Sequence, residues 1–277
     1  QFTRVFGISS IIAIARSTDQ TRFFLEAEAV NPIPSNTTYS EFKQLVSACL
    51  AEAGAAVTGE CTTWGGSTTS PANNYGTIPN WNTSLVTDME SAFFGKSSFN
   101  GNISSWDTSS VMDMNGMFAE ATAFNQPIEK WTTSSVTDMT YMFAQATAFN
   151  RPIEKWTTSS VMDMSFMFAQ ATAFNQAIGK WTTSSVTSME YMFNDAATFD
   201  QDISTWTGTA ANTTQDGMFD GATAFQAKYG SFCTNNITGP PSTCKVPLPP
   251  SSSSRSPRFT KAVALVGFIS TIAPMLW

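Results

Sequence analysis

Histidine is absent from this chain of 277 residues, and charged residues are scarce at 13% of the total, about half of the usual share. Without an imidazole, the Ser-His-Asp triad, Cys-His nucleophiles and His-ligated zinc or iron are excluded. Basic residues are few as well, because 14 Lys and Arg stand against 21 Asp and Glu, a net charge of −7. This balance argues against a nucleic-acid-binding face and against a polybasic membrane patch. We expect a protein that is not an enzyme and has no cofactor.

What the sequence has instead is a repeat of 25 residues. The segments 131–155 and 156–180 differ at only six positions. Tryptophan recurs every 25 residues, and Val, Met, two Phe and Ile recur at fixed distances after it. The tryptophan column is Trp81, Trp106, Trp131, Trp156, Trp181 and Trp206. This register predicts a repeat architecture. The sixth unit, in which Met218 and Phe219 come one residue late, is predicted to be an atypical terminal coil.

One repeat unit predicts one short helix and one strand. The apolar residues of the central unit lie at helical spacing, and Asp138 or Thr137 could cap the start of the helix. These apolar residues are Met139, Met142, Phe143, Ala146 and Phe149. The segment 153–156 is the best strand candidate. Neither element could bury its apolar face alone, so we expect identical units to stack, with parallel strands about 4.8 Å apart and a continuous core.

The pattern W-x-T-S-x-V-x-x-M-x-x-M-F-x-x-A-x-x-F-N-x-x-I runs through residues 106–205, and "YGTIPNW" at 75–81 leads into it. This repeat resembles that of the BspA-like leucine-rich-repeat surface proteins. The resemblance implies an α/β solenoid, a right-handed leucine-rich-repeat-like stack of about six coils with parallel strands and short helices. It also implies adhesion or recognition at a cell surface rather than catalysis.

An N-terminal segment and helical cap (16–74) is expected to precede the repeats (75–230). Residues 38–54 predict an amphipathic helix that covers the first coil, with Thr38 and Glu41 as a capping box and Gly54 at its end. Its apolar stripe consists of Phe42, Leu45, Val46, Cys49 and Leu50.

The four cysteines lie outside the repeats, two before them and two after them, in an expected C-terminal cap at 231–246. We favour the disulfides Cys49–Cys61 and Cys233–Cys244, because the repeats hold the two ends apart and disulfide geometry spans only a few ångströms. Other pairings, free thiols or a metal site are the alternatives. Disulfides would indicate an oxidising compartment.

Both termini have the composition of processing signals. Residues 1–15 read as the remnant of a signal peptide, with an ordinary buried strand as the alternative. A Pro/Ser-rich linker (247–261) leads to a hydrophobic tail (262–277), which reads as a GPI signal with attachment candidates Ser251, Ser252 and Ser253. A retained tail-anchoring helix or the frayed end of a soluble protein are the alternatives. We expect a secreted protein that is held at the cell surface by a membrane anchor.

Five Asn-x-Ser/Thr sequons are glycosylation candidates only if the chain is secreted. They are Asn36, Asn82, Asn102, Asn212 and Asn236. Their number does not exceed what this composition gives by chance, and they avoid the central coils.

Two polar columns run through the repeats. Asp88, Asp113, Asp138 and Asp163 could form a calcium ladder, but capping of each predicted helix is favoured, since Ser188 takes the next position. The second column is expected to satisfy turn backbone groups along the stack. It consists of Asn100, Asn125, Asn150, Asn175 and Asp200.

Hydroxyl rows follow each central tryptophan and form a candidate binding surface. Stacking would place them in lines about 4.8 Å apart, although Ser and Thr can also satisfy their own turns. The rows are Thr132, Thr133 and Ser134; Thr157, Thr158 and Ser159; and Thr182, Thr183 and Ser184.

The function expected from the sequence is recognition or adhesion without catalysis, with an extracellular protein or glycan as the partner and no nucleic acid. The first alternative is a structural or lattice-binding protein of a cell wall, a mineral or ice that uses the hydroxyl rows. A carboxylate-dependent glycan hydrolase is the distant alternative, because no pair of carboxylates stands out.

Overall fold

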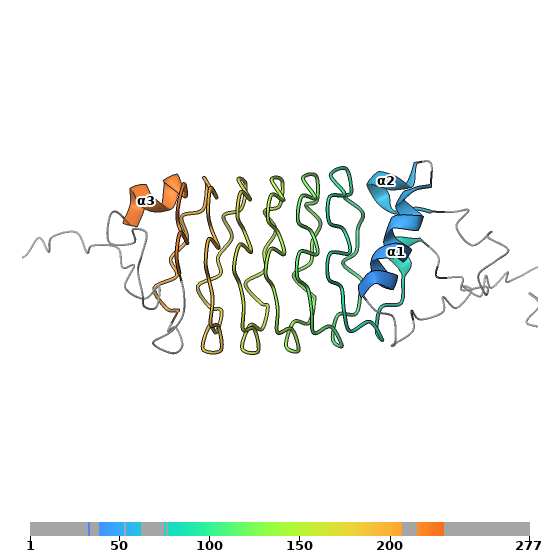
Figure 1. Ribbon diagram of the computed structural model, residues 1–277, viewed down its shortest axis with the longest axis horizontal. Coiled ribbons are helices and arrows are strands. Elements are labelled where there is room, and N and C mark those ends of the chain that lie inside the picture. Colours follow the sequence, from blue (N-terminus) through green and yellow to red (C-terminus); the bar gives the residue numbers. More distant parts are fainter. Residues whose placement is uncertain are drawn as a thin grey trace, which may run out of the picture.

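The computed structural model describes residue 33 and residues 39–52, 54–61, 75, 77–206 and 215–229. Its helices are α1 (Tyr39–Leu50), α2 (Ala55–Thr58), the 3-10 helix η2 (Ile78–Asn80) and α3 (Thr223–Tyr229). Between η2 and α3 the repeats form coils that stack along one axis, with α1 and α2 at one end and α3 at the other (Figure 1). We number the coils 1–6 from their tryptophans, so that coil 1 begins at Trp81 and coil 6 at Trp206.

The predicted helix of each repeat is wrong, because successive turns take its place. In coil 3 the Met142 N–H donates to the Met139 carbonyl at 3.2 Å, the spacing of a turn and not of an α-helix. Tyr141 and Gln145 have positive φ angles of 56° and 57°, which a right-handed helix does not contain. The Tyr141 N–H instead donates to the Ser165 carbonyl of the next coil at 3.0 Å. The residues predicted to be buried are buried, because turns of this kind also place residues three and four apart on one side.

The strand predicted at 153–156 is a turn as well. The Trp156 N–H donates to the Ile153 carbonyl at 3.1 Å, and residues 154 and 155 form the tip. Within the described residues, the parallel pairing between coils consists of isolated bridges at the aspartate column, from Asp88↔Asp113 to Asp163↔Ser188. The leucine-rich-repeat-like class and its right-handedness stay predictions.

The core consists of aromatic columns that run the length of the stack. Neighbouring tryptophan rings are nearly parallel, with centroids 6.2–6.5 Å apart. Each indole N–H of coils 2–6 donates to an isoleucine carbonyl of a preceding turn, as Trp156 Nε1 does to Ile128 at 3.1 Å. Within coil 3, Phe143 and Phe149 stack at 4.0 Å, and both are fully buried. Each buried phenylalanine contributes roughly 1.5–3 kcal/mol of hydrophobic stabilisation, so neighbouring coils stabilise one another.

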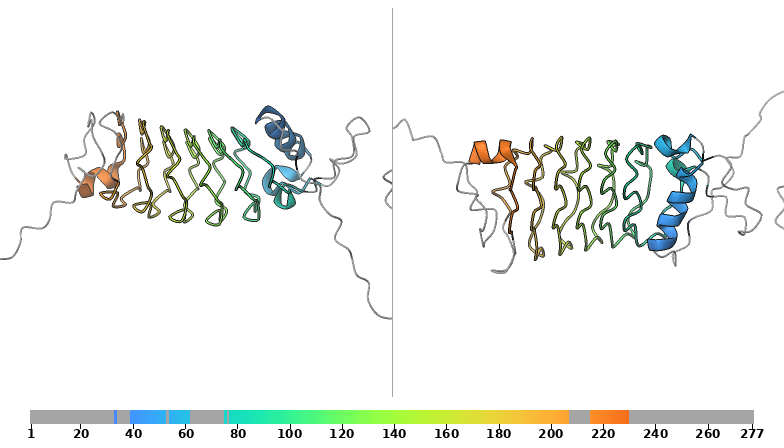
Figure 2. Two further views of the ribbon diagram at one scale, coloured as in Figure 1. Left: turned by 90° about the horizontal axis from the view of Figure 1, so that it is seen from below. Right: turned by 45° about the horizontal axis from the view of Figure 1, so that its top comes forward.

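The coils are closer together on one side of the stack than on the other. Equivalent rings are 4.6 Å apart between Tyr141 and Phe166, 5.6 Å apart between Phe143 and Phe168, and 6.4 Å apart between Trp131 and Trp156. The stack therefore curves, with the consecutive turns on its inner side and the tryptophans on its outer side. Figure 2 shows the coils spreading toward one edge.

The predicted N-terminal helix is confirmed as α1, and it covers the first coil. It ends at Leu50, however, and Gly54, predicted to end it, is the N-cap of α2. Its Phe42 ring packs edge-on against Trp81 and Trp106, with centroids 6.0 and 5.8 Å apart. The predicted disulfide Cys49–Cys61 is also confirmed, with the two Cα atoms 5.1 Å apart. It joins α1 to the segment that follows α2.

Helix α3 covers the other end of the described stack, and the sequence did not predict it. Phe225 continues the phenylalanine column, stacked 5.7 Å from Phe199, and Tyr229 packs 4.4 Å from Phe225. The predicted cap at 231–246, with Cys233 and Cys244, lies outside the described residues.

The predicted signal peptide (1–15), linker (247–261), GPI candidates Ser251, Ser252 and Ser253, and hydrophobic tail (262–277) also lie outside the described residues. Among the helices that the structure describes, none has both the length and the apolar character that a membrane span requires.

Candidate binding face

The aspartate column shapes the turns at which neighbouring coils pair. The Oδ1 atoms of Asp88, Asp113, Asp138 and Asp163 each accept the N–H of the residue two positions later at 2.8–2.9 Å. The prediction that these side chains cap backbone groups is confirmed, but they cap turns and not helices. In the described part of the chain, no group of three or more acidic or cysteine side chains could hold a metal ion.

Burial, together with the neighbouring carboxylates, raises the pKa values of two carboxyl groups on this side of the stack. Burial raises the pKa of Asp113 above its ordinary value, and Asp138 and Asp88 add to the rise, although the hydrogen bond from the Asn115 N–H opposes it. Burial likewise raises the pKa of Glu90, and the charges of Asp113 and Asp88 raise it further. This side of the stack therefore has a negative potential that a cationic partner would relieve.

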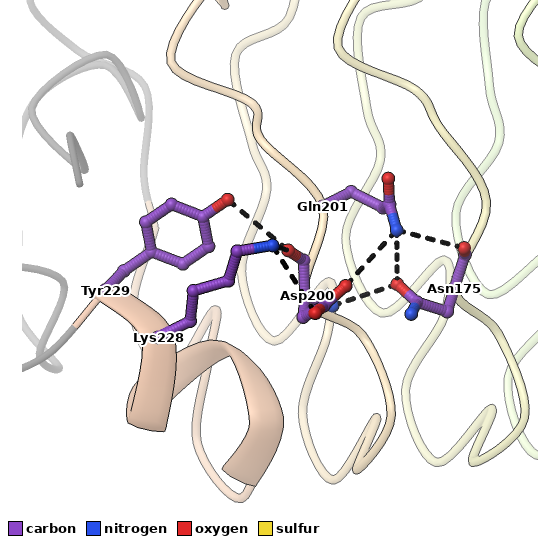
Figure 3. A network of polar contacts seen from close by, with 5 residues as sticks. All are labelled: Asn175, Asp200, Gln201, Lys228 and Tyr229. Atoms are coloured by element: carbon purple, nitrogen blue, oxygen red, sulfur yellow. Dashed lines mark hydrogen bonds and ion pairs between the residues drawn. The ribbon is translucent and has the colours of Figure 1, made fainter.

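The asparagine column is structural, as predicted. Each Oδ1 accepts the N–H of the next member of the column at 2.9–3.1 Å, from Asn100 to Asp200. At the C-terminal end, Gln201 Nε2 donates to Asn175 Oδ1 at 2.7 Å, and Lys228 Nζ of α3 lies 3.4 Å from Asp200 Oδ2 (Figure 3). The column thus connects the coils to the helix that covers them.

The hydroxyl rows are only partly available to a partner, which corrects the prediction. Thr133, Thr158 and Thr183 are buried, and the first two donate to the carbonyl of the following coil, as Thr133 does to Thr157 at 3.0 Å. The exposed members are Thr132, Ser134, Thr157, Ser159, Thr182 and Ser184. The neighbouring tryptophans repeat at 6.4–6.5 Å, so the spacing on this side exceeds the expected 4.8 Å.

Of the sequons, Asn82 and Asn102 are exposed in coil 1. Their Oδ1 atoms accept the N–H groups of Ser84 and Ser104 at 3.2 and 3.1 Å, so each side chain closes a local turn. Asn36, Asn212 and Asn236 lie outside the described residues.

A ladder of three aromatic side chains lies on the inner side of the curve, and the sequence reasoning missed it. Tyr141, Phe166 and Tyr191, here called the aromatic ladder, stack with centroids 4.6 and 4.9 Å apart. Tyr141 is 42% exposed and Tyr191 is 36% exposed. The equivalent residues are Ser91 in coil 1 and Gly116 in coil 2. This variation within an otherwise repeated sequence was the available signal.

The ladder residues have a backbone conformation that disfavours large side chains. Their φ angles are 56°, 57° and 52° for Tyr141, Phe166 and Tyr191. The left-handed conformation costs an L-residue roughly 1–2 kcal/mol, whereas glycine adopts it without this penalty. Gly116 and Gly217 do so at the same position in coils 2 and 6. Ser91 in coil 1 has the same conformation, with φ of 53°, so the left-handed backbone belongs to the repeated turn. Coils 3–5 differ from the others in carrying aromatic side chains there, at a cost that suits a functional role.

The two ends of the ladder differ. Gly217 leaves no room for a Cβ beside the ring of Tyr191, so that end is covered. At Gly116 an added Cβ would have only Ser91 Oγ within 4 Å, at 3.4 Å. Coil 2 therefore has no side chain that would continue the ladder beyond Tyr141, which is stacked on Phe166 alone.

We define the turn face as residues 87–95, 112–120, 137–145, 162–170 and 187–195, which include the ladder and the aspartate column. These segments contain eight acidic residues and no Lys or Arg. The exposed Met112 and Met162 add apolar surface to it. The face thus combines aromatic rings, flexible apolar side chains and negative charge.

An open hollow of about 620 Å³ lies elsewhere on the stack, where coils 3, 4 and 5 meet. It forms at Gly179, which occupies the position of Glu154 in the preceding coil. Lys180 and Asp202 line it with opposite charges, and hydrogen bonds from Ser204 lower the pKa of Asp202. The hollow has no aromatic face of its own that is open to a ligand, since Trp181 is only 3% exposed.

Comparison with known families agrees with the repeat architecture. The family described as "Mycoplasma protein of unknown function, DUF285" matches residues 67–165 and again residues 148–245. Together the two matches span 67–245, more than half of the chain. The chain belongs to this family. Both family segments contain ladder residues, Tyr141 in the first and Phe166 and Tyr191 in the second. No curated protein and no solved structure matches the chain.

Proposed function

We propose that this protein is a recognition or adhesion protein of the cell surface, and that it binds an extracellular protein or glycan through the turn face without catalysing a reaction. The observation that carries the proposal is the aromatic ladder, in which exposed Tyr141 and Tyr191 flank half-buried Phe166 on a backbone that favours glycine. Exposed, contiguous apolar surface usually marks an interaction site.

The proposed location has separate support. The disulfide Cys49–Cys61 is of a kind that persists in oxidising compartments. The predicted N-terminal signal and C-terminal GPI signal agree with export and membrane anchoring. We further propose that the repeats are of the BspA-like, right-handed leucine-rich-repeat kind, since the family match extends over the whole repeat region.

The alternative functions have less support. A lattice-binding role in a cell wall, on a mineral or on ice would use the hydroxyl rows, but Thr133, Thr158 and Thr183 are buried. A glycan hydrolase would need paired carboxylates, whereas the aspartates of the column accept hydrogen bonds from their own turns.

A binding panel tests the proposal. Purified protein is applied to immobilised extracellular-matrix proteins and to neutral, acidic and basic glycans. The ladder variant replaces Tyr141, Phe166 and Tyr191 by Ser, the residue that coil 1 carries at this position. The control variant is Leu85→Ser, because Leu85 is 42% exposed outside the turn face and coils 2–5 carry Ser there.

We expect the wild type and Leu85→Ser to bind at least one member of the panel, and the ladder variant to lose tenfold or more in affinity. Equal binding by all three proteins, or no binding to any member, would overturn the proposal. Antibody labelling of unpermeabilised source cells tests the location, and labelling that appears only after permeabilisation would contradict it.

A further inference from the structure

One end of the turn face already holds a cation over an aromatic ring. Lys43 of α1 places its Nζ atom 5.4 Å from the ring centroid of Phe94, which is 45% exposed in coil 1. A cation within about 6 Å of a ring face is attracted by the electron density of the ring. Burial raises the pKa of the nearby Glu90, the Asp113 and Asp88 charges add to the rise, and Lys43 opposes it. A lysine, an aromatic ring and carboxylates therefore meet within this chain.

Coils 3–5 repeat this chemistry on a larger scale without a cation. They carry the aromatic ladder beside Asp138 and Asp163. Among the described residues, the cation–aromatic contacts are those of Lys43 with Phe94 and Lys228 with Tyr229, and neither involves the ladder. The basic residues of coils 1–5 all lie outside the turn face: Lys96, Lys130, Arg151, Lys155 and Lys180.

We propose that the turn face of coils 2–5 docks an extended polypeptide segment rich in Arg and Lys, with one cationic side chain stacked on the open face of Tyr141 above Gly116. Guanidinium and ammonium groups suit both components of the face, because they stack on aromatic rings and pair with carboxylates. Acidic glycans would be repelled by the eight carboxylates. Neutral glycans could donate hydroxyl hydrogen bonds to them but would leave their charge unpaired. This inference rests on the proposed function and names the partner of that same face.

The probe is a synthetic peptide of alternating Arg and Ser, and its binding to the full chain is measured by fluorescence anisotropy at two salt concentrations. The comparison ligands are an alternating Glu and Ser peptide, a neutral glucose oligomer and a cationic glucosamine oligomer. The glucosamine oligomer separates a polypeptide partner from a cationic glycan, since both carry positive charge.

Two pairs of charge variants make the test specific. Asp138→Asn with Asp163→Asn removes two charges from the turn face and keeps the Oδ1 acceptor of each turn. Asp107→Asn with Asp202→Asn is the matched control, because these side chains accept the same N–H two residues later on other sides of the coils. All four substitutions create Asn-x-Ser/Thr sequons, so the proteins are made in a host without N-glycosylation.

We expect the Arg peptide to bind the wild type, with affinity that falls as salt rises. The loss should be about tenfold for the Asp138/Asp163 pair and tenfold or more for the Ser ladder variant, and less than twofold for the Asp107/Asp202 pair. Equal losses of affinity for the two charge pairs would mean that the peptide responds only to the net charge of the protein, and would overturn the inference. Tighter binding of the glucosamine oligomer, or an unchanged affinity of the ladder variant, would also overturn it.

The outcomes also separate this inference from the proposed function. One outcome is that the Arg peptide does not bind, while a partner from the panel binds the wild type but not the ladder variant. In that case the inferred cationic partner is wrong, and recognition by the turn face stands. If the ladder variant binds the panel partner as the wild type does, both proposals fail.

Discussion

The contribution of Tyr141 to stability distinguishes a binding role of the aromatic ladder from a structural one. Replacement of Tyr141 by Gly relieves the left-handed backbone of coil 3, worth roughly 1–2 kcal/mol. It also removes one stacking contact with Phe166, about 0.5–1.5 kcal/mol, and adds chain entropy to the unfolded state, about 0.5–1 kcal/mol. These contributions oppose each other, so the free energy of unfolding should change by no more than about 1.5 kcal/mol in either direction.

Phe143→Ala is the comparison, two residues away in the same coil. Phe143 is fully buried and stacks on Phe149, Phe118 and Phe168. Its truncation should cost about 3–5 kcal/mol, through lost burial and the cavity that remains.

Urea unfolding followed by tryptophan fluorescence measures both variants, because the tryptophan column lies in the core. Shifts of the midpoint at an unchanged slope report stability. A loss of more than about 2 kcal/mol in Tyr141→Gly would mean that the ladder holds the coils together, and the argument that its strain serves binding would be refuted.

Three further predictions concern the stack itself. Thr133→Val removes a buried hydrogen bond to the next coil and should lower the free energy of unfolding by about 1–2 kcal/mol. Thr132→Val, at an exposed position, should change it by less than about 0.5 kcal/mol. Equal effects in urea unfolding would contradict the burial pattern. Asp113→Asn should be more stable than the wild type at pH 7, because the raised pKa of Asp113 makes its ionised form costly in the folded state. The difference in the free energy of unfolding should disappear as the pH falls through that pKa. A wild type that is more stable than the variant at pH 7 would contradict this prediction. Reduction of Cys49–Cys61 should cost about 2–3 kcal/mol and lower the thermal midpoint. This loss should be absent when reductant is added to a Cys49→Ser/Cys61→Ser variant.

The sequence predicted which residues are buried better than it predicted the shape of the backbone. The fixed intervals of 25 residues identify the Trp, Val, Met, Phe and Ile columns, because only stacking brings equivalent residues of successive units together. The helix at 139–149 was wrong because spacings of three and four residues do not separate a helix from consecutive turns. The positive φ angles of Tyr141 and Gln145 make the difference, and neither residue type indicates such an angle.

The candidate site was harder to predict than the core. The hydroxyl rows were a candidate surface because Thr and Ser recur there, with their own turns as the alternative role. Burial of Thr133 leaves only alternate members of each row exposed. The ladder was missed because Tyr141 and Phe166 stand where coils 1 and 2 have Ser91 and Gly116, and attention was given to constant positions. In a repeat protein the constant positions form the core, whereas the variable positions are free to differ with function.

Hydrogen exchange of the full chain, with and without the Arg and Ser peptide, tests the central claim most directly. The account predicts that the bound peptide slows exchange in the turn-face segments of coils 2–5, which are 112–120, 137–145, 162–170 and 187–195. It predicts no change in 131–135, 156–160 and 181–185. Slower exchange confined to the hydroxyl segments, or no change anywhere at saturating peptide, would contradict the claim that the turn face is the recognition surface.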